Sequence, residues 1–134
     1  MNKRRVVVTG LGTVNPTGNS VTESWDAIKK GICGIAPITL FDTAEFKVKM
    51  AGEVKNFTPE IRIDKREARH MARFTQFALY AAEEAIHSSQ LLSTSDQSDP
   101  ATEPYEQKIS DADASKTGVI VSSGIGGIGV IEQE

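Results

Sequence analysis

The sequence has a single cysteine, few aromatic side chains and no long apolar run. Cys33 alone cannot form an intrachain disulfide or supply a multi-cysteine zinc site, so we expect no bound metal. No run approaches the ~20 apolar residues that span a bilayer. Behind the basic N-terminus, residues 6–8 are too short an apolar run for the core of a signal peptide. We therefore expect a cytoplasmic protein without membrane insertion.

The net charge is small and unevenly distributed. The formal charge is -3, with 13 Lys and Arg against 10 Asp and Glu in residues 1–90, and 2 against 8 in residues 91–134. Nucleic-acid binding needs a broad basic surface and, for single strands, stacking aromatic groups. This balance supports neither requirement, so we expect no nucleic-acid partner and only local electrostatic recognition.

Residues 64–90 contain no Gly or Pro and predict one long helix. Asp64 can act as its N-cap, with Glu67 three residues later. Apolar residues recur at steps of three and four, which predicts a buried face whose small members allow close packing. This apolar stripe consists of Met71, Phe74, Ala78, Ala81, Ala82, Ala85 and Ile86, with Phe77 beside it.

A basic ridge is expected beside that stripe, because Arg66, Arg69, His70 and Arg73 also recur at helical spacing. Such a ridge suits an acidic partner. The alternative is an ordinary solvated helix face, which is the usual outcome for a basic run. Judged from these residues alone, the solvated face is the preferred interpretation.

Two β-branched runs predict strands. Residues 5–11, closed by Gly10 and Gly12, suit a strand buried on both faces, and residues 117–121 suit a second one followed by a glycine-rich bend. Strands joined through helices favour parallel pairing by a right-handed crossover. Because two strands cannot form a sheet covered on both faces, the pattern is typical of the first part of a larger α/β domain.

Shorter elements lie between these runs. Ser20 and Glu23 form a capping box and Gly31 a natural stop, which predicts a helix over residues 21–30. Residues 32–57 predict irregular extended segments or a hairpin lying over the core, and the acidic residues 93–116 predict a mobile surface loop. The expected apolar face of the first helix is Val21, Trp25 and Ile28.

Several short motifs, taken in order along the chain, carry a family resemblance. They are residues 3–12, Pro16 with Gly18 and Asn19, Trp25, Gly34 and Ile35, Phe41 and Asp42, Ala51 and Gly52, residues 66–74 and residues 123–127. Together they make the chain similar to the N-terminal third of the bacterial β-ketoacyl-acyl carrier protein synthases of type II. The similarity spans nearly the whole chain except the acidic loop, part of which looks like an insertion because the family's link is shorter there.

The resemblance implies an α/β fold, a thiolase-like αβαβα sandwich that this chain completes only in part. Residues 1–134 would form the N-terminal portion of a condensing-enzyme domain with an acidic inserted loop at about 93–116. The parent enzyme would need no cofactor, would act as a homodimer, and would elongate fatty acids by condensing malonyl-acyl carrier protein with a cysteine-bound acyl chain.

The resemblance places no catalytic residue in this chain. The family's nucleophile lies in a Cys-Ser or Cys-Thr context well beyond residue 134, whereas Cys33 lies between Ile32 and Gly34 and is expected to be a small, partly buried side chain. His70 and His87 match neither catalytic histidine, and His87 is expected to face solvent or to form an ordinary hydrogen bond. We therefore expect the chain alone to be inactive.

Two peripheral roles carry over from the family. The positions that contact acyl carrier protein match Arg66, Arg69 and His70, with Lys65 and Arg73 close by; lysine is common where this chain has His70. Ile125 matches the isoleucine that type II enzymes place against the acyl pocket. Given this resemblance, we prefer to interpret the basic ridge as a docking surface for acyl carrier protein and not as a solvated helix face.

Two alternatives remain open. The chain could be a non-catalytic fragment that at most binds acyl carrier protein. More distantly, Gly10-Leu11-Gly12 after a predicted strand is typical of a nucleotide-binding oxidoreductase, although Asn15 stands where the third glycine belongs.

Overall fold

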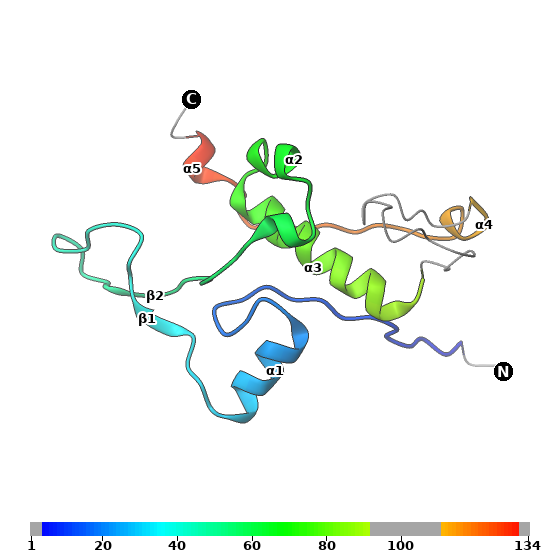
Figure 1. Cartoon of the computed structure of the whole chain (residues 1–134), viewed down its shortest axis with the longest axis horizontal. Helices are drawn as coiled ribbons and strands as arrows, with labels where there is room; N and C mark the ends of the chain where they lie inside the picture. The colour runs from blue at the N-terminus through cyan, green and yellow to red at the C-terminus, as the bar shows by residue number, and fades with distance from the viewer. Residues whose placement is uncertain (1–3, 92–110, 132–134) are drawn as a thin grey trace.

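The computed structural model describes residues 4–91 and 111–131 of the chain (Figure 1). The elements follow one another along the chain as α1 (Val21–Lys29), β1 (Ile35–Pro37), β2 (Met50–Gly52), a 3-10 turn η1 (Pro59–Ile61), α2 (Lys65–Arg69), α3 (Arg73–Ser89), α4 (Asp111–Ala114) and α5 (Ile128–Ile131). The helix α3 lies at the centre of the picture, with the N-terminal segment running along it. The remaining elements are arranged around these two segments.

The largest buried cluster of the described residues lies on one side of α3. Ile63, Ala68 and Tyr80 are buried there, and Phe57 packs against them. The ring of Phe57 meets the ring of Tyr80 edge to face, with centroids 5.1 Å apart, and meets Phe77 in the same way at 4.8 Å. Such aromatic pairs add stability beyond the area they bury. The turn before α2 and the helix α3 are thereby held together.

The predicted helix over residues 64–90 is broken into α2 and α3. Its start at Asp64 is confirmed, since the Asp64 carboxylate accepts hydrogen bonds from the backbone N–H groups of Arg66 and Glu67. The break lies at residues 70–72, where Ala72 has an extended backbone. The Gln76 side chain donates from Nε2 to the carbonyl of Ala68 at 2.7 Å and of Met71 at 3.2 Å. A side-chain donor thus satisfies carbonyls that a continuous helix would bond internally.

The prediction that residues 5–11 and 117–121 are buried strands is wrong for the described chain. Val6 is 93% exposed and Ile120 is 97% exposed, and neither run forms a strand. A strand needs a neighbour to pair its backbone, and the sheet found in the described residues is the two-stranded β1–β2 sheet. The expected parallel crossover is therefore not formed within this part of the chain.

Side chains of α3, rather than a strand ladder, hold the N-terminal segment. Ser88 Oγ accepts a hydrogen bond from Leu11 N at 2.9 Å, and the Glu84 carboxylate accepts one from Thr13 N at 3.1 Å. Gly10 and Gly12 lie directly against the helix: a Cβ atom at either position would overlap the carbonyl oxygen of Ala85 or Ala81. The two glycines are needed for this close approach.

The predicted first helix is confirmed as α1, ending one residue early, but its inward face differs from the expected one. The buried residues of α1 are Ser24 and Ala27, whereas Trp25 and Ile28 are 58% and 60% exposed. Gly31 has a φ of +67°, which fits the left-handed turn expected after a helix. The two large apolar side chains form a surface rather than a core.

A hairpin forms within residues 32–57, as one of the two predicted possibilities. Strands β1 and β2 pair antiparallel, with Ile35 opposite Gly52 and Pro37 opposite Met50. In Figure 1 the hairpin projects away from α3 instead of covering it. At the tip of the hairpin the partly exposed rings of Phe41 and Phe46 pack edge to face, with centroids 5.5 Å apart. Of the predicted acidic loop, residues 93–110 lie outside the described residues, and Asp111–Ala114 form α4 instead of irregular chain.

Glu84 of α3 bonds to both the N-terminal segment and the first residue of α1, so its replacement tests how these parts are held together. Its Oε2 atom accepts from Thr13 N at 3.1 Å and its Oε1 atom accepts from Val21 N at 3.0 Å. In Glu84→Gln one acceptor becomes an N–H group facing another N–H group. We expect the free energy of unfolding to fall by about 1–2 kcal/mol. A urea titration followed by far-UV circular dichroism measures the change; a loss no larger than that of the exposed control Glu45→Gln would contradict this role.

Candidate functional site

Helix α2 and its C-cap carry four exposed basic side chains. This basic patch, as we call it below, consists of Lys65, Arg66, Arg69 and His70. Within the described part of the chain, none of the four takes part in an ion pair. The backbone N–H groups of Glu67 and Arg66 hold the pKa of Asp64, the N-cap, below its ordinary value. A charged cap starts the short helix, and the patch points its cations toward solvent.

Arg73 does not belong to the basic patch, although the sequence placed it on the same ridge. The helix break moves it onto α3, where its guanidinium lies 5.2 Å from the ring centroid of Phe77 and 5.8 Å from that of Phe57. It also donates a hydrogen bond to Val54 O at 3.3 Å. Because these contacts occupy the guanidinium, Arg73 serves the packing of α3 more than an outside partner.

The glycine-rich bend lies against the junction between α2 and α3. A cleft of about 440 Å³ is lined there by two groups of residues, 72–74 and 126–130. Gly126 has a φ of +80°, a backbone conformation that L side chains rarely adopt. Ile125, next to it, is 76% exposed. The described structure thus presents Ile125 on a surface and does not enclose it in a pocket.

The N-terminal glycines do not form a nucleotide site. Gly10 and Gly12 are used for packing on α3, and the N-terminus of α1 is already occupied. Ser20 Oγ accepts from Glu23 N at 3.2 Å, and the Glu84 carboxylate accepts from Val21 N at 3.0 Å. A carboxylate at a helix N-terminus takes the place that a pyrophosphate would need. This geometry speaks against the dinucleotide-binding interpretation.

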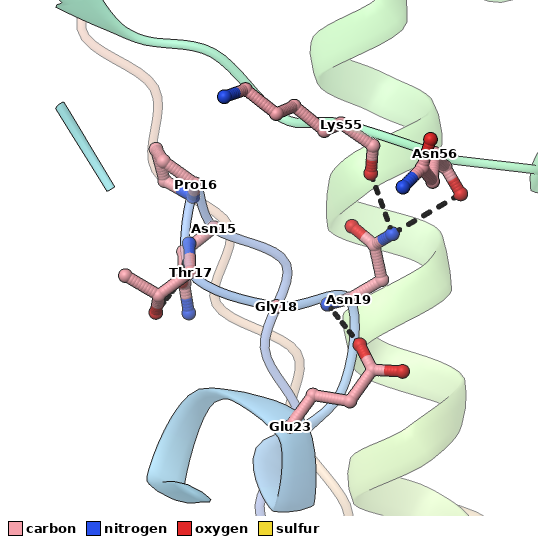
Figure 2. A pocket seen from close by; sticks show the side chains of 8 residues that line it. All are labelled: Asn15, Pro16, Thr17, Gly18, Asn19, Glu23, Lys55 and Asn56. Carbon is pink, nitrogen blue, oxygen red and sulfur yellow. Dashed lines mark hydrogen bonds between the residues drawn. The ribbon is translucent and has the colours of Figure 1, made fainter. Parts of the chain in front are cut away.

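A shallow pocket lies beside the turn that precedes α1, and several of its polar side chains bond to the protein itself (Figure 2). Asn19 Nδ2 donates to the carbonyls of Lys55 and Asn56 at 2.9 and 3.3 Å, and Asn19 N donates to a Glu23 carboxylate oxygen at 2.8 Å. Asn15 is used in the same way, donating from Nδ2 to Ser24 Oγ at 2.8 Å. The pocket therefore ties the turn to the segment after β2, although Asn19 Oδ1 is buried there without a hydrogen-bond partner among the described residues.

The cysteine and histidines form no catalytic arrangement in the described chain. Cys33 is exposed, not partly buried as predicted, because it lies in the open connection between α1 and β1. His87 faces solvent, as expected, with Nε2 3.7 Å from a Glu83 carboxylate oxygen. No three His, Cys, Asp or Glu side chains among the described residues are placed to hold a metal ion.

Glu83 gives a testable pH dependence. Burial raises the pKa of Glu83 above its ordinary value of 4.5, while the positive charges of Arg62 and His87 partly oppose the shift. The native state therefore binds this proton more strongly than the unfolded state does. The free energy of unfolding should fall as pH rises from 4.5 through the native pKa.

The variant Glu83→Gln should remove that part of the pH dependence. Urea titrations at several pH values above 4.5 measure it. The variant should show a smaller loss of stability than the wild type over this window. An equally steep or steeper loss would contradict the assignment to Glu83.

Comparison with known proteins identifies the family of this chain. Residues 3–134 match the family described as "Beta-ketoacyl synthase, N-terminal domain". The chain belongs to the beta-ketoacyl synthase family. It is 43% identical over 129 residues to 3-oxoacyl-[acyl-carrier-protein] synthase 2 of Staphylococcus aureus, covering 96% of this chain and 27% of that protein. It is 36% identical over 134 residues to the synthase 2 of a Synechocystis species, covering all of this chain and 28% of that protein.

A solved ketosynthase structure supports the same assignment. The structure described as "The ishigamide ketosynthase/chain length factor" superposes with a TM-score of 0.60 at 37% identity, covering 66% of this chain and 22% of that chain. The predicted resemblance to type II synthases is thus confirmed. The chain spans about a quarter of the length of the curated relatives it matches. Within the described residues, no helix combines the length and apolarity needed to cross a membrane.

Membership of the ketosynthase family gives the exposed apolar runs a physical meaning. β-Branched side chains favour positions packed between neighbouring strands, and here residues 6–8 and 119–121 face solvent. A ketosynthase N-terminal domain with both runs uncovered fits a partial domain. The sequence did not reveal Glu84 or Gln76 as joining residues, because isolated polar side chains on a helix carry no periodic signal.

Proposed function

We propose that this chain is the N-terminal portion of a β-ketoacyl-acyl carrier protein synthase with the thiolase-like αβαβα fold. The observation that carries the proposal is the family match over residues 3–134, together with 43% identity to a protein named as a 3-oxoacyl-[acyl-carrier-protein] synthase. The full-length parent would be a fatty-acid-elongating acyltransferase. Its expected homodimer and cytoplasmic location stay predictions.

The proposed reaction balances without a cofactor. A cysteine thiolate of the parent attacks the acyl thioester of the carrier protein, forming a new thioester and releasing the carrier thiolate, which takes a proton from water. Malonyl-acyl carrier protein then loses CO₂, and the carbon that keeps the electron pair attacks the enzyme thioester. A C–C bond forms, the C–S bond to the cysteine breaks, and β-ketoacyl-acyl carrier protein leaves. Exposed Cys33, in an open connection, is not assigned to this step.

The basic patch is proposed as the docking surface for the acidic carrier protein. Arg66 and Arg69 are exposed on a helix of two turns or fewer, and His70 caps it. The absence of ion pairs at these side chains within the described chain leaves their charge available to a partner. Long-range attraction to such a patch mainly speeds the encounter.

Ile125 is proposed as a wall of the acyl pocket in the complete enzyme. Its side chain is large, apolar and 76% exposed in the described chain, so it is available for a lipid chain or for covering protein segments. The bend that carries it lies beside the open cleft at the α2–α3 junction. The role in the acyl pocket is itself carried over from the family resemblance.

A condensation assay tests the proposed function. The full-length parent, incubated with an acyl-acyl carrier protein and malonyl-acyl carrier protein, should yield β-ketoacyl-acyl carrier protein and CO₂, detected by mass spectrometry. The 134-residue chain should yield neither. If the parent binds the carrier protein without producing a ketoacyl product, the alternative of a non-catalytic carrier-binding protein replaces this one.

A further inference from the structure

The glycine-rich bend is supported by one aromatic side chain of α3. A Cβ atom built at Gly126 would lie 3.5 Å from Phe74 Cζ, and one built at Gly127 would lie 3.3 Å from Phe74 Cε1. The same added atom at Gly127 would lie 3.1 Å from the Cβ of Ala72. An added methyl group would thus make ordinary contact with the Phe74 ring at Gly126 but would crowd the ring edge and Ala72 at Gly127, so the bend lies close to Phe74 at Gly127.

The bend has few other restraints that would fix its position. The backbone hydrogen bond found in the described chain for this segment joins Val130 N to Gly127 O at 2.9 Å, which lies within the turn into α5. Gly126 adopts a φ of +80°, and glycine is freer to move between conformations than any other residue. By contrast, Phe74 lies in the first turn of a 17-residue helix and has only two rotatable side-chain bonds. Phe74 is 41% exposed and extends from a regular helix, whereas the glycines that it faces lie in an irregular segment.

We propose that Phe74 is a positioning residue that sets the acyl-chain length accepted by the enzyme. This inference rests on the proposed function, in which Ile125 lines the acyl pocket. Because Ile125 is bonded directly to Gly126, raising or lowering the bend on the Phe74 ring moves the Ile125 side chain into or out of that pocket. Phe74 itself touches no reacting atom; it acts through Ile125.

A pair of substitutions in the full-length parent tests the contact. Gly127→Ala places a methyl group against the Phe74 ring edge and Ala72, and so should push the bend away from α3 toward the pocket. The kcat/KM for a long acyl primer should fall about tenfold, with a smaller change for a short primer, since overpacking by one methyl group is felt in a packed site. Adding Phe74→Leu removes the ring edge and should restore most of the activity on the long primer.

The matched control is Gly129→Ala. A Cβ atom at Gly129, in the adjoining helix α5, would meet nothing within 4 Å, so the same chemical change is made two residues away without a contact. This variant should keep the wild-type ratio of long-primer to short-primer activity. The KM for the carrier protein should be unchanged in all variants, because the basic patch is left intact.

The outcomes separate this role from the proposed function. A parent that condenses no acyl primer of any length removes the proposed function, and this role with it. An active parent in which Gly127→Ala lowers long and short primers equally, or in which Phe74→Leu restores nothing, overturns the role of Phe74 alone. If Gly127→Ala does not fold, Phe74→Leu by itself decides the matter: it should raise the long-to-short activity ratio, and an unchanged ratio overturns the proposal.

Discussion

Replacing Gly12 by alanine is expected to detach the N-terminal segment from α3. The added Cβ atom would overlap the carbonyl oxygen of Ala81 and lie 2.8 Å from its carbonyl carbon. A backbone carbonyl within a helix cannot rotate away as a side chain can. We expect the free energy of unfolding to fall by about 3 kcal/mol or more, at or beyond the upper end of what overpacking usually costs. That loss is a large part of the roughly 5–15 kcal/mol that stabilises a typical domain.

Urea titration of the chain, followed by far-UV circular dichroism, measures this effect. The matched control is Gly118→Ala, because a Cβ atom at Gly118 would meet nothing within 4 Å and Gly118 is exposed. The control should stay within about 0.5 kcal/mol of the wild type. If Gly12→Ala behaves like the control, the N-terminal segment does not pack closely on α3.

Reversing two charges of the basic patch is expected to have the largest functional effect. The double variant Arg66→Glu and Arg69→Glu replaces two exposed cations on α2 with anions. Like charges placed against an acidic partner cost several kcal/mol at an interface. The apparent KM of the full-length parent for acyl carrier protein should rise about 30-fold or more. The kcat should change much less, because neither side chain takes part in the reaction.

A matched reversal elsewhere separates docking from net charge. Lys30→Glu with Lys47→Glu makes the same change in total charge at two exposed lysines, one after α1 and one in the hairpin. This control should alter KM by less than about threefold, and raising the ionic strength should shrink the effect of the patch variant. An equal rise in KM for both double variants would leave the patch as an ordinary solvated face.

The helix starts and the family could be predicted from the sequence because both depend on local patterns. Asp64 and Ser20 act as N-caps, as their spacing from Glu67 and Glu23 indicates. The condensing-enzyme family is likewise recognisable from the order of its short motifs along the chain. What local patterns cannot report is competition between side chains and backbone. The long helix breaks where neither Gly nor Pro marks it, and Gln76 donates to the carbonyls of Ala68 and Met71 at this break.

Burial was the least predictable property. The β-branched runs carry the composition of buried strands, yet Val6 and Ile120 are almost fully exposed, because burial depends on neighbours that a run does not itself encode. The same limit applies to α1, where the small residues Ser24 and Ala27 face inward and Trp25 faces out. The candidate site follows this pattern: the shared face of the basic residues of α2 was predictable from their spacing, whereas the contact with the bend joins α3 to a segment far along the chain.

The location of the acyl group on the enzyme tests the central claim most directly. The full-length parent should be incubated with acyl-acyl carrier protein without malonyl substrate, digested, and mapped by mass spectrometry. We expect one acylated cysteine beyond residue 134 and none at Cys33, and we expect the isolated 134-residue chain to remain unmodified. An acyl group on Cys33, in the parent or in the isolated chain, would contradict the view that this chain supplies docking charge and part of the acyl pocket but no nucleophile.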